Sequence, residues 1–289
     1  MCEGYLMRWS TEQQKRFQEE GFLLLPEYFS PVEVRLMKGE LAALLNEDSP
    51  RRVVEKEGSM VRSVYGSHAH NEVFNRLSKH PRLVKPAAQL LGSDVYVYQF
   101  KINAKARFGG DRWDWHYDYV FWQKEDGLPS PRVTNVAVFL DDVTEFNGPM
   151  FLIPGSHKAQ LAGQESREAV EEVFKYAPYQ KGPMWIADLT ADLKYSLDNQ
   201  TVEDLVLKYG IVAPKGPAGS ALFFDSTLVH ASPNNISPFN RVTVVISYSS
   251  VNNVPTGGDN ARPDFLVSRD HEPITPLSDD TLLRYIPGI

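Results

Sequence analysis

The chain has 289 residues, 42% of them hydrophobic, and a formal net charge of −7 at pH 7. This length and composition predict a single domain over residues 1–289 with a sizeable core, and the acidic balance argues against nucleic acid as a partner. No apolar run approaches the roughly 18 residues of a membrane span and no secretory signal is expected, so we expect a cytoplasmic protein without a membrane partner.

The first third of the chain, about residues 10–92, carries the signals of helices. Serine caps, a proline at a first helical position and acidic residues in a first turn mark where these helices begin. A short apolar strand over residues 21–26 separates the first helix from the second. Three helices are expected: one that opens at Ser10, one from Pro31 to about Asn46, and one from His80 or Pro81 to Leu91.

From Val95 onward, segments rich in β-branched and aromatic residues alternate with turns that contain proline, glycine or asparagine. The expected strands are Tyr96–Ala106, Val133–Leu140, Met150–Ile153, Ile211–Ala213, Ser220–Phe224 and Arg241–Tyr248. A polar insertion at about 160–208, with a helical piece at Glu168–Tyr176, predicts either a lid or a dimer arm, and a dimer arm would make the protein a homodimer. Helices packed outside a double-sheet, cupin-like jelly roll fit this order, so the expected class is mainly β with flanking helices (α+β).

One pattern carries the chemistry of a metal site: His116-Tyr117-Asp118, with His230 far downstream. Two residues that are two apart on a strand point to the same face, so His116 and Asp118 are expected to lie together. Two imidazoles and one carboxylate form the facial triad of non-haem Fe(II) oxygenases, which leaves three coordination positions open. A lone His-x-Asp occurs by chance in many chains, but here a buried strand and a turn lead into His230. The single cysteine, Cys2, excludes a cysteine-based zinc or iron–sulfur site.

Arg241 follows His230 by eleven residues and opens a strongly β-branched run that predicts a central strand. A buried guanidinium needs an anionic partner, because an unpaired charge is costly to bury. A co-substrate carboxylate held by a bidentate fork would suit it, and a structural salt bridge to Asp or Glu is the alternative. Together, the triad and Arg241 predict an iron enzyme that uses an oxo-acid and dioxygen.

Several motifs together resemble the phytanoyl-CoA dioxygenase family, and within it most nearly the ectoine hydroxylase branch. The resemblance extends from Gly21 to about Tyr248. It implies a double-stranded β-helix, Fe(II), 2-oxoglutarate and dioxygen as co-substrates, and hydroxylation of an unactivated carbon with release of succinate and carbon dioxide. The motifs are Trp115-His116-Tyr117-Asp118, Trp122, Glu125-Asp126-Gly127, Asn147-Gly148-Pro149, Ile153-Pro154-Gly155-Ser156-His157 and His230-x-Ser232.

The resemblance also assigns roles to individual positions of this chain. The iron ligands would be His116, Asp118 and His230. Contacts to 2-oxoglutarate would come from Arg241, Ser232 and Asn103. The substrate pocket would include Gln99 and Trp122. Gln99 and Asn103 are four apart on one expected strand, so both could face the iron, although such amides often only bond to neighbouring backbone.

Departures from the ectoine enzymes bear on the substrate. Tyr119 stands where the ectoine enzymes tend to carry a small or hydroxylated residue, and Thr243 and Val245 replace an amide and an aromatic residue that help to enclose ectoine. Tyr119 and Val245 are therefore expected to line a pocket of different shape. A small polar metabolite is therefore expected: a free or cyclic amino acid, or an intermediate of secondary metabolism. A CoA thioester is disfavoured because no basic cluster is present for its phosphates. Arg62 is expected either to reach an acidic substrate group or to form a surface salt bridge.

Asp118 favours hydroxylation over halogenation, because a halogenase needs a small residue there so that chloride can bind. Desaturation, cyclisation and oxidative dealkylation use the same iron chemistry and stay open. Two other classes also stay open: a non-catalytic, cupin-like binding module, which would not consume 2-oxoglutarate, and a metal-dependent isomerase. The remaining histidines are expected in turns, loops or helix starts, with His68 and His70 at the pocket mouth and His80 and His271 exposed.

Overall fold

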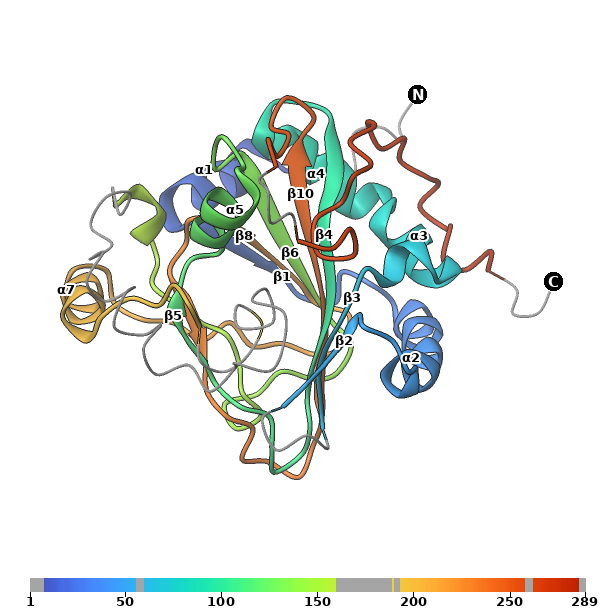
Figure 1. Cartoon of the computed structure of the whole chain (residues 1–289), viewed down its shortest axis with the longest axis horizontal. Helices are drawn as coiled ribbons and strands as arrows, with labels where there is room; N and C mark the ends of the chain where they lie inside the picture. The colour runs from blue at the N-terminus through green and yellow to red at the C-terminus, as the bar shows by residue number, and fades with distance from the viewer. Residues whose placement is uncertain (1–7, 56–59, 160–188, 190–192, 258–261, 286–289) are drawn as a thin grey trace.

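Two antiparallel sheets form the centre of the structure, a computed structural model (Figure 1). The larger sheet has the strand order β1-β8-β6-β10-β4-β3-β2, and the smaller has the order β5-β9-β7. The structure describes residues 8–55, 60–159, 189, 193–257 and 262–285. The strands are β1 (Phe22–Leu25), β2 (Arg52–Val54), β3 (Val61–Tyr65), β4 (Val95–Lys105), β5 (Trp113–His116), β6 (Val133–Phe139), β7 (Phe151–Leu152), β8 (Ala221–Asp225), β9 (His230–Ser232) and β10 (Arg241–Ser250).

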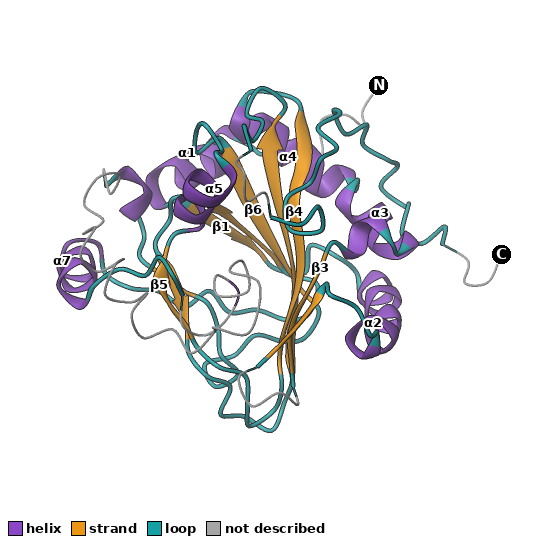
Figure 2. Ribbon diagram, in the orientation of Figure 1, coloured by secondary structure: helices purple, strands orange, loops and turns teal. Residues whose placement is uncertain are grey.

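Four helices cover the outer face of the larger sheet (Figure 2): α1 (Thr11–Glu20), α2 (Pro31–Asn46), α3 (Glu72–Ser78) and α4 (Pro81–Leu91). Ser10 and Ser30 each begin a helix with a capping box, in which the serine hydroxyl accepts from the backbone N–H three residues on. The three expected helices are therefore confirmed, and α3 is an additional one. The expected class, mainly β with flanking helices, is confirmed as well.

The central strands separate an apolar core from a polar interior. On β10, Val244 and Ile246 face the helices, within a cluster that includes Phe100 and Ile102 of β4. The alternate residues point the other way, because successive side chains of a strand face opposite sides. On that inner side, Thr243 of β10 pairs with Asn103 of β4. Mostly polar residues at alternate positions of these buried strands thus line the space between the two sheets.

A buried ion pair ties this interior to the C-terminal segment. Arg262 donates to both carboxylate oxygens of Asp126, with distances of 2.8 Å from Nε and 2.5 Å from Nη2, and the hydroxyl of Tyr98 donates to the same carboxylate. Asp126 is the last residue of α5 (Asp118–Asp126), and both charged side chains are buried. The pair therefore holds the end of α5 against β4 and the segment around Arg262.

The first prediction concerns this pair. Asp126→Asn removes the counter-charge of a buried guanidinium, so we expect the free energy of unfolding to fall by roughly 3–5 kcal/mol. Urea denaturation followed by circular dichroism measures it. Glu19→Gln is the control, because Glu19 pairs with Lys15 on the surface of α1 and should change stability little. A midpoint for Asp126→Asn equal to that of the wild type would contradict the role given to the pair.

Other expectations for the fold have mixed outcomes. Four of the expected strands match β4, β6, β8 and β10 to within two residues at each end, and β7 is shorter than expected. Ile211–Ala213 is not a strand: Val212 forms only an isolated bridge with Leu152. Most of the expected insertion, including Glu168–Tyr176, lies outside the described residues, and its end forms α7 (Asn199–Tyr209). No helix in the described ranges has the length and apolarity of a membrane span.

Candidate functional site

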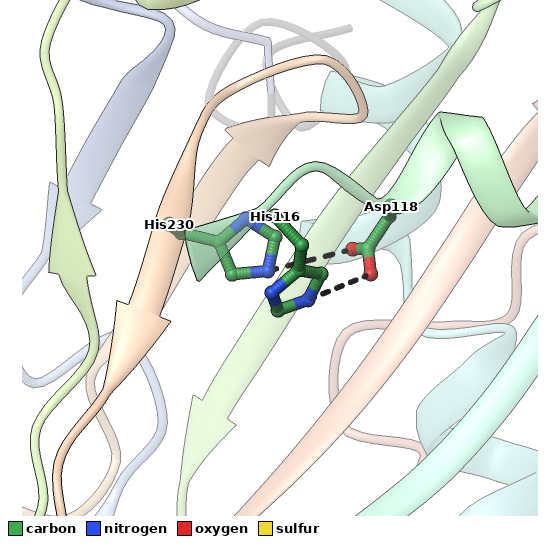
Figure 3. Close-up of side chains that lie close together, drawn as sticks. All are labelled: His116, Asp118 and His230. Atoms are coloured by element: carbon green, nitrogen blue, oxygen red, sulfur yellow. Dashed lines mark ion pairs between the residues drawn. The ribbon is translucent and has the colours of Figure 1, made fainter. Parts of the chain in front are cut away.

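His116, Asp118 and His230 bring their side chains together between the two sheets (Figure 3). His116 ends β5 and His230 begins β9, and the two residues are directly paired across these antiparallel strands. Their ring centroids are therefore only 4.2 Å apart. Nε2 of His116 lies 3.8 Å from Oδ1 of Asp118, and Nε2 of His230 lies 4.0 Å from Oδ2. One donor atom from each residue lies within 4.8 Å of the others, a grouping that could hold a metal ion.

The three expected residues do lie together, but the geometry that the sequence argument gave them is wrong. His116 and Asp118 do not share a strand: β5 ends at His116, and Asp118 is the first residue of α5. An acidic residue in the first turn of a helix is stabilised by the unpaired backbone N–H groups there. The turn from strand to helix at Tyr117, and not the alternation of a strand, directs the carboxylate toward the imidazoles.

Backbone carbonyls orient both imidazoles. Nδ1 of His116 is 2.6 Å from the carbonyl oxygen of Asp114, and Nδ1 of His230 is 2.9 Å from that of Leu228. A carbonyl only accepts, so Nδ1 carries the proton in each ring and Nε2 presents its lone pair toward Asp118. Burial lowers the pKa of His116 to about 3 and also lowers the pKa of His230, so both rings are neutral at pH 7. Neutral imidazoles are the form that binds a metal.

Asp118 is held as a carboxylate. Burial by itself would raise its pKa, but Lys101, the two imidazoles and Asn135 together outweigh burial and lower it. The amide nitrogen of Asn135 donates to Oδ2 of Asp118 at 2.9 Å, and the hydroxyl of Ser247 donates to the amide oxygen of Asn135 at 2.6 Å. Asn135 and Ser247 come from adjacent strands, β6 and β10. This chain of hydrogen bonds fixes the orientation of the carboxylate.

A cavity of about 40 Å³ on one side of the cluster, the first lobe, includes Arg241, Ser232, Asn103 and Thr243 in its lining. Burial lowers the pKa of Arg241 to about 10, so its guanidinium remains charged at pH 7. Nη1 donates to the Thr243 hydroxyl at 3.2 Å and Nη2 to the Ser232 hydroxyl at 3.5 Å, while Nε has no hydrogen-bond partner. No carboxylate of the described residues lies within ion-pair distance of it. The guanidinium is therefore a buried cation suited to an anionic ligand, and the structural salt bridge is not found in the described part of the chain.

A second cavity, of about 30 Å³, adjoins the cluster. This second lobe shares Lys101, Trp113, His116 and Asp118 with the first. Among the residues that line only the second lobe are Tyr65, Gln99, Phe121, Trp122 and Arg262. Gln99 lines the lobe, and its amide nitrogen also donates to the backbone carbonyl oxygen of Leu266 at 2.9 Å. The structure thus places Gln99 and Trp122 together, as expected for a substrate pocket.

Val245 lines the first lobe, beside the triad, and not the second. Two other expected pocket residues need correction. Tyr119 lines neither lobe, and its hydroxyl donates to the carbonyl of Leu128 at 3.2 Å. Consecutive residues of a helix point in different directions, so Tyr119 turns away from Asp118, whereas Trp122, four residues on from Asp118, returns to its face.

Arg62 also differs from what was expected of it. Its guanidinium donates to Glu55 at 3.0 Å and to the carbonyl oxygens of Leu189 and Arg112, and it lies 3.7 Å above the ring of Trp113. Both Arg62 and Glu55 are buried. Arg62 is therefore neither a substrate ligand nor a surface ion pair: it is the centre of a buried network that supports the strand carrying His116.

Two other histidines differ from expectation. His80 is fully buried, and its Nδ1 caps α4 by accepting from the backbone N–H of Arg82. His68 stacks on Phe100, a residue on the helix-covered side of β4, and does not line the pocket mouth. His157 lies in the turn that was expected for it, with Nε2 at 3.1 Å from the carbonyl oxygen of Gln18. None of the three belongs to the cluster of His116, Asp118 and His230.

Comparisons with known proteins agree with this arrangement. The sequence model of the phytanoyl-CoA dioxygenase (PhyH) family matches residues 17–243. An L-proline trans-4-hydroxylase from Streptomyces griseoviridis is 38% identical over 267 residues, which are 92% of this chain and 96% of that protein. An ectoine dioxygenase from Bordetella bronchiseptica is 34% identical over 269 residues, 90% of this chain and 82% of that protein.

Solved structures give the same result. EctD from S. alaskensis, in a crystal structure with 2-oxoglutarate and 5-hydroxyectoine, aligns with a TM-score of 0.77 at 30% identity, over 93% of this chain and 87% of that one. The same protein has been solved with bound Fe, with a TM-score of 0.76. The family match spans most of the chain and the relatives cover nearly all of it, so this protein belongs to the phytanoyl-CoA dioxygenase family.

Proposed function

We propose that this protein is an Fe(II)- and 2-oxoglutarate-dependent dioxygenase that hydroxylates a free cyclic amino acid, with L-proline as the first candidate. One observation carries the proposal. Two neutral imidazoles and one carboxylate converge beside a buried arginine that forms no ion pair with the described residues and whose Nε has no hydrogen-bond partner there. A relative named L-proline trans-4-hydroxylase and a neighbour crystallised with 2-oxoglutarate support it.

The donor set fits Fe(II). Two imidazole nitrogens and one carboxylate oxygen are the ligands of the facial triad, and three coordination positions remain for co-substrates. We assign Nε2 of His116, Nε2 of His230 and the carboxylate of Asp118 as these ligands. Bound there, the iron would supply the activation of dioxygen that couples 2-oxoglutarate decarboxylation to hydroxylation. The residues of this chain supply geometry: Asn135 holds the carboxylate in place, and the carbonyls of Asp114 and Leu228 hold the rings.

The first lobe fits 2-oxoglutarate. Arg241 would grip the distal carboxylate as a planar fork, which gives its partnerless Nε an acceptor. The hydroxyls of Ser232 and Thr243, which already contact the guanidinium, would share that carboxylate. Asn103 lies in the same lobe, with its amide oxygen held by the Ser63 hydroxyl at 3.0 Å. We propose these residues as the co-substrate site.

The second lobe fits a small substrate. The lobe is small, with a cavity volume of about 30 Å³, which favours a molecule of amino-acid size over an acyl-CoA. Tyr65, Phe121 and Trp122 supply apolar walls, and Gln99 supplies a polar contact. Because Tyr119 and Val245 lie outside this lobe, they no longer argue against ectoine. The preference for proline rests instead on the relative that is 38% identical.

The second prediction tests the substrate. L-proline, pipecolate and ectoine are each incubated with the enzyme, Fe(II), 2-oxoglutarate and dioxygen, with succinate and product mass as readouts. We expect kcat/KM for L-proline to exceed that for ectoine by at least about tenfold, because pocket fit discriminates such ligands by this amount or more. Efficient hydroxylation of ectoine would contradict the preference, and turnover of only long acyl-CoA thioesters would contradict the substrate class.

The product distinguishes the remaining outcomes. Hydroxylation adds one oxygen atom, desaturation and cyclisation remove two hydrogens, and oxidative dealkylation shortens the substrate. We propose hydroxylation, because Asp118 is present and both relatives are named hydroxylase or dioxygenase. A non-catalytic binding module would release no succinate with any substrate.

Three further proposals rest on the sequence alone. They are a single domain over residues 1–289 with a lid or arm at about 160–208, a cytoplasmic location, and a role in secondary metabolism. The single cysteine and the acidic composition are consistent with the second. Homodimer formation stays a prediction that analytical ultracentrifugation tests.

A further inference from the structure

Lys101 places a cation where the two lobes meet. It lies on β4 between Gln99 and Asn103, and the three share the inner face because alternate residues of a strand point the same way. Lys101 lines both lobes, its side chain is only 15% exposed, and its Nζ lies 4.0 Å from Oδ1 of Asp118. This contact with Asp118 is its one ion pair among the described residues, none of which accepts a hydrogen bond from Nζ.

The other basic side chains near the second lobe already have partners, and Arg241 lies outside this lobe. Arg262 is paired with both oxygens of Asp126, and Arg62 is paired with Glu55. Lys105, on the same face of β4, donates to the carbonyl oxygens of Asp111 and Pro233. Arg241 faces the first lobe. Among the described residues that line the second lobe, Lys101 is therefore the cation with donors to spare.

A count of charges shows what Lys101 lacks. In the proposed complex, Fe(II) and Arg241 together carry three positive charges. Asp118 and the two carboxylates of 2-oxoglutarate carry three negative charges, so this group is neutral. Lys101 then has no counter-charge, and an unpaired ammonium that is mostly out of water is costly. One carboxylate entering the second lobe would supply the missing charge.

We propose that Lys101 binds the carboxylate of the substrate, and this inference rests on the proposed function. Nζ lies within reach of both the metal ligands and the second lobe, so a carboxylate anchored there would hold the rest of the molecule beside the triad. Tyr65, Phe121 and Trp122 also line this lobe and would offer aromatic faces to the ring and its secondary ammonium. The substrate class is therefore a zwitterion with a free carboxylate, and an amide or ester of the same ring is discriminated against.

The test compares L-proline with L-prolinamide, which has the same ring without the negative charge. Lys101→Met removes the charge at similar length, Lys101→Arg keeps it, and Lys15→Met is the matched control at an exposed lysine of α1. For Lys101→Met we expect the KM for L-proline to rise about 10- to 100-fold, as for a lost hydrogen bond to a charged group. The preference for the acid over the amide should vanish, and the KM for 2-oxoglutarate should change by less than about threefold. Lys101→Arg should retain most of the preference, and Lys15→Met all of it.

Each failure has its own signature. If the wild type turns over L-proline and Lys101→Met keeps the preference for the acid, this inference is wrong and the proposed function stands. A rise in the KM for 2-oxoglutarate alone would assign Lys101 to the co-substrate and overturn the inference. A wild-type enzyme that turns over no amino acid would contradict both this inference and the proposed function. If Lys101→Met is inactive, anaerobic calorimetry with Fe(II) and 2-oxoglutarate compares binding of the two ligands, and an unchanged difference in affinity overturns the inference.

Discussion

Replacing His230 with alanine abolishes Fe(II)-dependent release of succinate and leaves the fold largely intact. This is the expected result because the triad supplies only three donors and His230 is one of them, opposite His116 across β5 and β9. The structural loss is modest, since the hydrogen bond of Nδ1 to the Leu228 carbonyl contributes about 1 kcal/mol. The enzyme should bind Fe(II) far more weakly, which anaerobic dialysis and metal analysis measure, while circular dichroism reports the fold.

His157→Ala is the matched control for this result. His157 lies in a turn, outside the cluster of three donors, with Nε2 on the carbonyl oxygen of Gln18. It should keep its iron and its turnover. His116→Ala should behave like His230→Ala. Full activity in either triad variant would contradict the assignment of the metal ligands.

Arg241→Ala should have the second largest effect, on the affinity for 2-oxoglutarate. The guanidinium is buried, and removing one partner of a buried charge pair costs roughly 3–5 kcal/mol. The apparent KM for 2-oxoglutarate should therefore rise by about two orders of magnitude or more. The KM for the amino acid, measured at saturating 2-oxoglutarate, should change little because Arg241 does not line the second lobe.

Arg241→Lys separates charge from geometry. A lysine keeps the positive charge but cannot form a planar fork, so it should recover only part of the affinity. Steady-state succinate release over a range of 2-oxoglutarate concentrations gives the apparent KM for 2-oxoglutarate of the wild type, Arg241→Ala and Arg241→Lys. If Arg241→Lys matched the wild type, the bidentate picture would be wrong and a point charge would suffice.

Local signals in the sequence were enough to predict the helices and the central strands. The capping serines Ser10 and Ser30 mark two helix starts, because an N-cap is a contact between residues three apart. The apolar run after Arg241 marks β10 for the same reason: its alternation and β-branched residues are local. The triad could be predicted because two histidines, an aspartate and an arginine recur together in a known family.

The errors arose where a long-range contact decides the answer. That Asp118 begins a helix, and that Tyr119 therefore turns away from the pocket, depends on packing that no local pattern reports. Arg62 was misread because its partner Glu55 lies across the hairpin and its carbonyl partners come from distant segments. Lys101 and Asn135 were missed although both lie at inward positions of expected strands. Their significance depends on strand register, which places each beside Asp118.

The central claim is that the triad and Arg241 form one site for Fe(II) and 2-oxoglutarate. Anaerobic titration of Fe(II) into the protein with 2-oxoglutarate present tests it most directly, because chelation of the metal by the oxo-acid gives a weak visible charge-transfer band. We predict that the band appears at one iron per chain in the wild type, is lost in His230→Ala, and needs far more 2-oxoglutarate in Arg241→Ala. A folded wild-type protein that gives no band, or a band of equal strength in His230→Ala, would contradict the account.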